Sequence, residues 1–144
     1  MNPQADRISI NAPIEHVWDV FTDVERWPQW TQSVTRVERV KGSGVDVGAV
    51  VRMKQPRLPV MQWTVTNVVP GESWKWVARS PGVITVASHT LTPTSATTTS
   101  VEQSIEHRGL FAWFSALATR GLTRRYLRLE GEGLKARCER VRAA

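Results

Sequence analysis

An amphipathic segment that starts with a proline and ends in a tryptophan-rich turn constrains the fold of this sequence most strongly. Pro13 suits the first position of a helix, where no amide donor is needed. Asp23 can cap a further turn over residues 24–26, which ends near Trp27 because the residue before a proline avoids the helical region. A loop carrying Trp27 and Trp30 should follow. The apolar residues of the first helix recur at the spacing of one helix face: Ile14, Val17, Trp18 and Phe21.

The middle of the chain predicts a series of β-strands. Stretches rich in β-branched residues, partly alternating with polar ones, are separated by short turns that contain glycine or proline. Short links favour antiparallel neighbours. In addition to a first strand at Ser9 and Ile10, the expected strands span residues 34–40, 49–54, 61–69, 73–79, 84–92 and 97–107.

From Phe111 onward the sequence predicts one long helix, because helix-forming residues dominate and no proline follows. Its apolar arc is wider than a flat sheet requires, so we expect a curved sheet that grips it. We interpret Trp113, like Trp18, as a core anchor. Gly121 and Gly133 each cost a helix about 1 kcal/mol relative to alanine, which indicates a packing role. One apolar stripe comprises Phe114, Leu117, Ala118, Leu122, Leu129 and Ala136, and a second comprises Leu127, Leu134, Cys138 and Val141.

Composition limits the range of functions. The chain has 144 residues, of which 41% are hydrophobic, which predicts one globular domain over residues 1–144. Cys138 is the only cysteine, so neither an intramolecular disulfide nor a thiolate metal cluster is expected. The glycines of residues 42–48 join two strands and so do not form a phosphate loop. No cofactor and no metal site are predicted, because the three histidines lack ligand spacing: His16, His89 and His107.

The charge distribution is uneven along the chain. The 19 basic and 13 acidic residues give a net charge of +6, and much of the excess lies between Arg120 and Arg142. We interpret these charges as the solvated flanks of the last helix, with weak contact to an anionic surface as the alternative. No nucleic-acid motif accompanies them, so no specific nucleic-acid partner is expected. Since no leader and no unbroken apolar span are visible, a cytoplasmic protein without a transmembrane segment is predicted.

Three groups of residues, in this order over essentially the whole chain, carry a family resemblance. They are the opening from Ala12-Pro13 to Trp27-Pro28-Gln29-Trp30, the strand end Val68-Val69-Pro70, and the terminal run from Arg124 to Lys135. They resemble the polyketide cyclase/dehydrase branch of the START-like SRPBCC superfamily. The resemblance implies an α+β helix-grip fold, in which a curved seven-stranded antiparallel sheet surrounds a long C-terminal helix and two short helices follow the first strand.

The resemblance also implies a deep, mostly apolar cavity between the sheet and the long helix, which holds a lipid-like or other hydrophobic small molecule. The loop with Trp27 and Trp30 would close its mouth. Strand residues alternate faces, so Trp63 and either Trp74 or Trp76 should reach the interior. The predicted ligand contacts are Trp27, Trp30, Trp63, Val65, Asn67, Trp76, Ala87, His89, Val101, Gln103, Phe114 and Ala118.

The leading hypothesis for function is binding of an aromatic or polycyclic molecule, because indole rings offer broad apolar faces. Asn67, His89 and Gln103 would orient the ligand. A second hypothesis is an enzyme of the cyclase/dehydrase type with His89 as general acid or base. A third is an interaction protein that acts through its basic C-terminal helix. His16 and His107 are expected at the surface.

The aromatase/cyclase relatives carry two polar residues linked to ring closure. One is an arginine on the strand that includes Trp63, and the other is a tyrosine after the tryptophan loop. The matching positions here are Asn67 and Val34. This departure speaks against ring closure of that type, although Arg52 and Arg79 lie on strands whose register the sequence leaves open.

Overall fold

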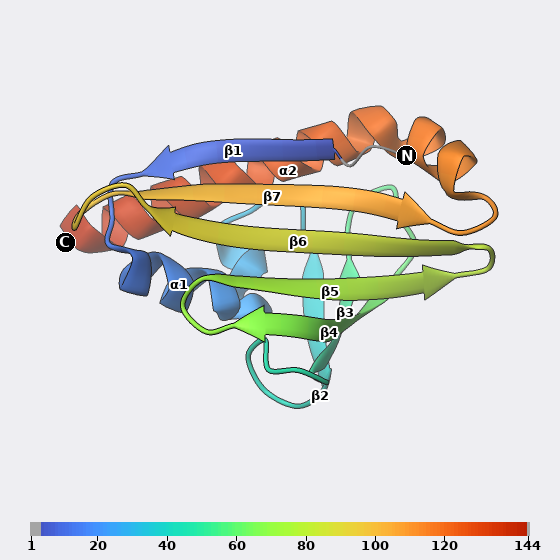
Figure 1. The fold of residues 1–144 in the computed structure, drawn as a ribbon, viewed down its shortest axis with the longest axis horizontal. Coiled ribbons are helices and arrows are strands. Elements are labelled where there is room, and N and C mark those ends of the chain that lie inside the picture. The colour runs from blue at the N-terminus through green and yellow to red at the C-terminus, as the bar shows by residue number, and fades with distance from the viewer. Residues whose placement is uncertain (1–3, 144) are drawn as a thin grey trace.

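Seven antiparallel strands form one curved sheet in the order β1-β7-β6-β5-β4-β3-β2. The computed structural model describes residues 4–143 and the side chains as far as Arg140. Figure 1 shows the long strands of this sheet running across the molecule. The strands are β1 (Gln4–Ile10), β2 (Arg36–Lys41), β3 (Val50–Lys54), β4 (Met61–Val69), β5 (Ser73–Ser80), β6 (Val83–Pro93) and β7 (Thr99–Arg108).

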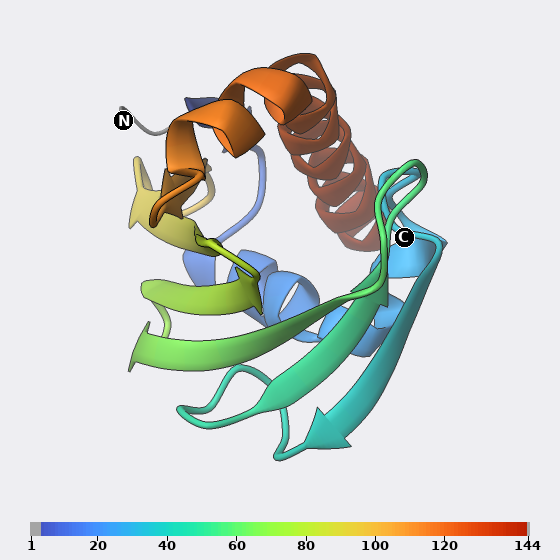
Figure 2. The same cartoon turned by 90° about the vertical axis from the view of Figure 1, so that its right-hand side faces the viewer.

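Three helices complete the fold. After β1 come α1 (Ile14–Thr22) and the short 3-10 helix η1 (Val24–Gln29), and the chain ends in α2 (Ala112–Ala143). Figure 2 shows α2 on the inner side of the curved sheet, with its first turns lying across one end. The predicted α+β helix-grip architecture is thereby confirmed. None of the helices described has the length and apolar content that a membrane crossing requires.

Several boundaries differ from the predicted ones, including the start of β1 at Gln4, and two of the differences have clear local reasons. Residues 94–98 form a turn in which the backbone amide of Thr94 donates to the carbonyl of Thr98, so β7 begins only at Thr99. η1 continues through Pro28 to Gln29, which places Trp27 inside a helix and not on a loop. Trp27 is buried, and its indole Nε1 donates to the carbonyl of Phe21 over 2.9 Å.

A β-bulge in β4 overturns the predicted inward orientation of Asn67. Val65 pairs with Trp76 and Asn67 pairs with Lys75, so Thr66 is an extra residue in the strand. The extra residue reverses the alternation of side chains beyond it. Asn67 is therefore exposed, while Trp63 and Val65, which precede the bulge, are buried as expected.

The two apolar stripes of α2 differ in burial. Leu127, Leu134 and Cys138 of the second stripe are buried, whereas the side chain of Val141 lies outside the described residues. Most of the first stripe faces water. Trp113 also faces water, so the interpretation of Trp113 as a core anchor was wrong. The helix offers one side to the sheet, and Trp113 lies on the other. The first-stripe members are Phe114, Leu117, Ala118 and Ala136, which are exposed, and Leu122 and Leu129, which are half-buried.

Gly133 has a clear packing role on α2. A Cβ atom at this position would collide with the backbone carbonyl oxygen of Trp30, and it would also approach the Trp30 ring to 3.2 Å. A glycine therefore lets the helix lie directly against the segment that follows η1. At Gly121, by contrast, nothing lies within 4 Å of an added Cβ.

The core fills only part of the space inside the sheet. Phe21 of α1 stacks on Trp27 at 5.6 Å between ring centroids and meets Trp74 edge-on at 4.8 Å. Leu134 and Cys138 of α2 belong to the same buried cluster. Side chains of the core thus cover the inner face of the sheet next to α1 and η1. The cavity lies over the remaining part of this face.

Candidate functional site

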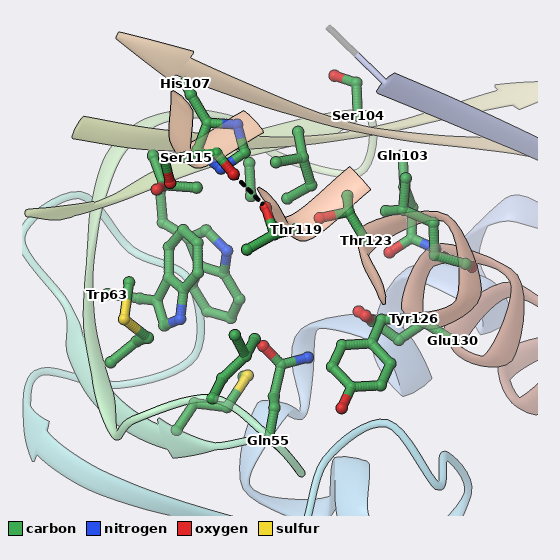
Figure 3. Close-up of a pocket in the computed structure, with 18 of the residues that line it drawn as sticks. Gln55, Trp63, Gln103, Ser104, His107, Ser115, Thr119, Thr123, Tyr126 and Glu130 are labelled. Atoms are coloured by element: carbon green, nitrogen blue, oxygen red, sulfur yellow. Dashed lines mark hydrogen bonds between the residues drawn. The ribbon is translucent and has the colours of Figure 1, made fainter. Parts of the chain in front are cut away.

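A cavity of about 270 Å³ lies between the inner face of the sheet and α2. Figure 3 shows the open space, with Trp63 on one side and Tyr126 and Glu130 on the opposite side. Strands β3 to β7, the segment between β3 and β4, η1 and α2 all contribute to its wall. The lining residues are Trp27, Met53, Gln55, Leu58, Pro59, Met61, Trp63, Trp76, Ser80, Val83, Thr85, Ala87, His89, Gln103, Ser104, Ile105, His107, Ser115, Thr119, Thr123, Tyr126, Leu127 and Glu130.

Three tryptophans from different elements make up the aromatic part of the wall. Trp63 and Trp76 lie on neighbouring strands with ring centroids 5.7 Å apart, and Trp27 is 5.6 Å from Trp76. The indole Nε1 of Trp63 is buried and has no hydrogen-bond partner among the described groups. A buried donor without a partner makes the folded state less stable. A ligand oxygen that accepts a hydrogen bond from Trp63 would remove this penalty.

His89 lines the cavity and is buried. Its ring stacks on Trp74, with centroids 4.0 Å apart and an angle of 11° between the planes. Nδ1 lies 3.3 Å from the carbonyl oxygen of Trp74, which can only accept, so Nδ1 is the donor and Nε2 carries no proton. Burial lowers the pKa of His89 to about 3. The imidazole is therefore neutral at pH 7 and is a poor proton donor.

Glu130 of α2 is the acidic residue of the cavity wall, and it is buried. Burial raises the pKa of its carboxyl group to about 8, although a hydrogen bond with Ser33 acts in the opposite direction. At pH 7 the carboxyl group is therefore mostly protonated. Beside it, the hydroxyl of Tyr126 donates to the carbonyl oxygen of Pro56, which joins α2 to the segment between β3 and β4.

The face of α2 that borders the cavity is unusually polar. Its residues recur at spacings of three or four, which places them on one side of the helix. The Thr119 hydroxyl donates to the Ser115 carbonyl over 2.8 Å within the helix. From β7, Gln103 donates through Nε2 to the carbonyl of Leu127 over 3.4 Å. The polar helical residues of this face are Ser115, Thr119, Thr123, Tyr126 and Glu130, and the apolar Leu127 lines the cavity beside them.

Half of the predicted ligand contacts line the cavity, namely Trp27, Trp63, Trp76, Ala87, His89 and Gln103. Val65 and Val101 face inward but are covered by the packed core next to α1. Trp30 is half-buried beneath Gly133, and Trp27 forms an inner wall of the cavity and not its mouth. Three further predictions are not matched by the structure, because Asn67, Phe114 and Ala118 are exposed.

His107 corrects another prediction. It was expected at the surface, but it is half-buried and lines the cavity, because it shares the inward alternation of Gln103 and Ile105 on β7. Burial lowers the pKa of His107. Glu130 and Tyr126 also line the cavity and were not among the predicted contacts. Their signal in the sequence is a series of polar residues at helical spacing from Ser115 onward.

The charged residues of the neighbouring strands stay out of the cavity. Arg52 on β3 and Arg79 on β5 are exposed, and Val34 is buried without lining the cavity. None of the lining residues, all of which lie in the described range, is a lysine or an arginine. Within residues 4–143 there is also no group of three or more histidine, cysteine or acidic residues placed to hold a metal ion.

Comparison with protein families gives a direct assignment. A family model described as polyketide cyclase / dehydrase and lipid transport matches residues 5–139. The chain belongs to this family. The match agrees with the START-like resemblance of the sequence. No curated protein sequence matches the chain.

Solved structures share the fold of this polyketide cyclase/dehydrase family member at low sequence identity. The Zhui aromatase/cyclase from Streptomyces sp. R1128 has a TM-score of 0.76 and 16% identity, over 96% of this chain and 94% of that one. A START superfamily protein from Mycobacterium smegmatis has a TM-score of 0.73 and 14% identity, over 96% and 98%. Truncated norcoclaurine synthase from Thalictrum flavum has a TM-score of 0.74 and 15% identity, over 94% and 91%.

Proposed function

We propose that the protein binds a neutral aromatic or polycyclic small molecule that carries an oxygen acceptor. The observation that carries this proposal is the cavity of about 270 Å³ walled by Trp27, Trp63 and Trp76, in which the Nε1 donor of Trp63 has no partner. Burial of apolar ligand surface contributes about 25 cal/mol per Å², and one hydrogen bond to Trp63 would fix the orientation.

The ligand should be neutral because the wall of the cavity offers no cation. A carboxylate or sulfonate would lose its hydration on entering the cavity and would gain no ion pair, because no lysine or arginine is among the lining residues. Glu130 is mostly protonated at pH 7, so it can donate a hydrogen bond to a neutral ligand. Three probes with the same ring system separate these effects: naphthol, naphthalene and naphthalenesulfonate.

We expect naphthol to bind more tightly than naphthalene, and naphthalenesulfonate not to bind. Isothermal titration calorimetry measures all three. Trp63→Ala should abolish binding of both neutral probes, because it removes an aromatic wall. Trp63→Phe keeps a ring and removes only the donor, so it should weaken naphthol about fivefold and leave naphthalene unchanged. Equal binding of the sulfonate, or unchanged binding by Trp63→Ala, would refute the proposal.

A second candidate is proton-transfer catalysis of the cyclase/dehydrase type. Glu130 favours it, since a carboxyl group with a pKa of about 8 can act as a general acid near neutral pH. In this candidate His89 would be neither the acid nor an effective base, because its pKa is about 3, and its unprotonated Nε2 would accept a hydrogen bond that orients the substrate. The test is a Glu130→Gln variant that keeps ligand binding and loses turnover of a dehydratable substrate.

A further inference from the structure

Five large apolar side chains face water around the start of α2. Their exposed fractions are 79% for Leu110, 54% for Phe111, 62% for Trp113, 62% for Phe114 and 59% for Leu117. We call these five residues the apolar patch. Contiguous exposed apolar surface of this kind is rare on a soluble domain and marks an interaction site.

The polarity of the first turns of α2 is the reverse of that of an ordinary surface helix. A surface helix turns its apolar side to the protein and its polar side to water. Here Ser115 and Thr119 border the cavity, whereas Trp113 and Leu117 point away from the protein. Packing within the domain does not require these outward apolar residues, so they are best explained by something outside the domain.

The charges beside the apolar patch are mostly basic. Between Glu106 and Glu130 the sequence has five arginines and no acidic residue, and one of the five, Arg108, is paired with Glu106 at 3.0 Å. Arg120 and Arg124 follow Trp113 and Leu117 at spacings of three or four residues, so they continue the same face of the helix. Both arginines are exposed. The surface therefore runs from apolar at the start of the helix to basic farther along it.

The apolar patch is held on the rim of the cavity. The backbone amide of Phe111 donates to the carbonyl oxygen of Gly82 over 3.0 Å, and the Phe111 ring covers Gly82 so closely that a Cβ there would collide with it. Val83, the next residue, lines the cavity, and so does Ser115. The segment that carries the patch is thus fixed beside the turn between β5 and β6, at one end of the curved sheet (Figure 2).

We propose that the apolar patch docks onto an anionic lipid bilayer. Trp113, Phe114 and Leu117 would lie at the boundary between headgroups and acyl chains, where aromatic residues are favoured. Arg120 and Arg124 would contact lipid phosphates. A second copy of this chain fits less well, because residues 107–129 contain no acidic residue, so the same face of a second copy offers Arg120 and Arg124 no counter-charge. Docking would place the rim of the cavity against the lipid.

Flotation with vesicles tests the proposal directly. We expect the protein to float with vesicles that contain phosphatidylserine, to float poorly with pure phosphatidylcholine, and to be released by salt. Trp113→Ser with Phe114→Ser should lower the partition coefficient about tenfold or more. Arg120→Gln with Arg124→Gln should lower it about 25-fold, since each charge contributes about fivefold. Val47→Ser removes an exposed apolar residue elsewhere and should change nothing.

Three results would overturn the proposal. They are an absence of binding to phosphatidylserine vesicles, flotation of the Trp113→Ser/Phe114→Ser variant equal to that of the natural protein, and a dimer of the natural protein in sedimentation velocity that is absent from this variant. Circular dichroism of the variants checks folding, which should persist because both side chains are mostly exposed. Naphthol binding without vesicles is measured separately, so failure at the membrane and failure of the cavity are distinguishable.

Discussion

Glu130→Gln will stabilise the protein above about pH 8 and leave its stability nearly unchanged below about pH 4.5. Burial raises the pKa of this carboxyl group from 4.5 to about 8 in the folded protein. Between these values the folded state holds a proton that the unfolded state releases, so the stability of the natural protein falls as pH rises. Glutamine has the same shape and no charge, and it removes this dependence.

The effect should be large because each unit of pKa difference corresponds to about 1.4 kcal/mol. We expect a difference of about 3 kcal/mol or more in the free energy of unfolding at pH 9, measured by urea denaturation. Burial also lowers the pKa of His89 to about 3, but this contribution is the same in both proteins and cancels in the difference. Parallel pH profiles for the two proteins would contradict this account of Glu130.

Glu132→Gln is the matched control, since Glu132 lies two residues away on the same helix and is exposed. It should keep the pH dependence of the natural protein. A control profile that changed as much as that of Glu130→Gln would show that the effect comes from the charge of the helix and not from burial in the cavity wall.

Gly133→Ala will destabilise the protein by about 2–4 kcal/mol, which exceeds the helix-propensity gain of about 1 kcal/mol from the same change. The new methyl group would overlap the carbonyl oxygen of Trp30, which belongs to the backbone and has little room to move. Helix α2 would have to shift away from the segment after η1. Thermal and urea unfolding measure the loss.

Gly121→Ala makes the same chemical change in the same helix, with open space around the added Cβ. It should raise stability by up to about 1 kcal/mol. The pair separates packing from propensity, because the two substitutions are predicted to have opposite signs. Stabilisation by Gly133→Ala would show that α2 does not lie against Trp30 as described.

The fold was predictable because its signals are local and repeat along the chain. Proline at residue 13, the helical spacing that ends at Phe21, and the alternating strands with turns between them each specify an element. The curved sheet was predicted correctly, but the wide apolar arc of α2 was not its sign, because most of the first stripe faces water and does not contact the sheet. The pattern of α2 did not show which stripe faces the sheet, because the two stripes have the same helical spacing and similar apolar residues.

The candidate site was only partly predictable, for two physical reasons. A bulge at Thr66 turns Asn67 outward, and a single extra residue leaves no clear sign in a strand sequence. The polar side of the cavity comes from Glu130 and Tyr126 on α2, whereas the contacts predicted on this helix were the apolar residues Phe114 and Ala118. Trp63 and His89 were placed correctly because they lie on unbroken stretches of alternation.

Mass spectrometry of the organic extract of gently purified protein tests the central claim most directly. The account predicts a stoichiometric neutral, aromatic or polycyclic molecule in the extract of the natural protein and its absence from a Trp63→Ala/His89→Ala variant that remains folded. Retention of the same molecule by that variant would contradict the claim, because the ligand would then lie outside the cavity that these two side chains line.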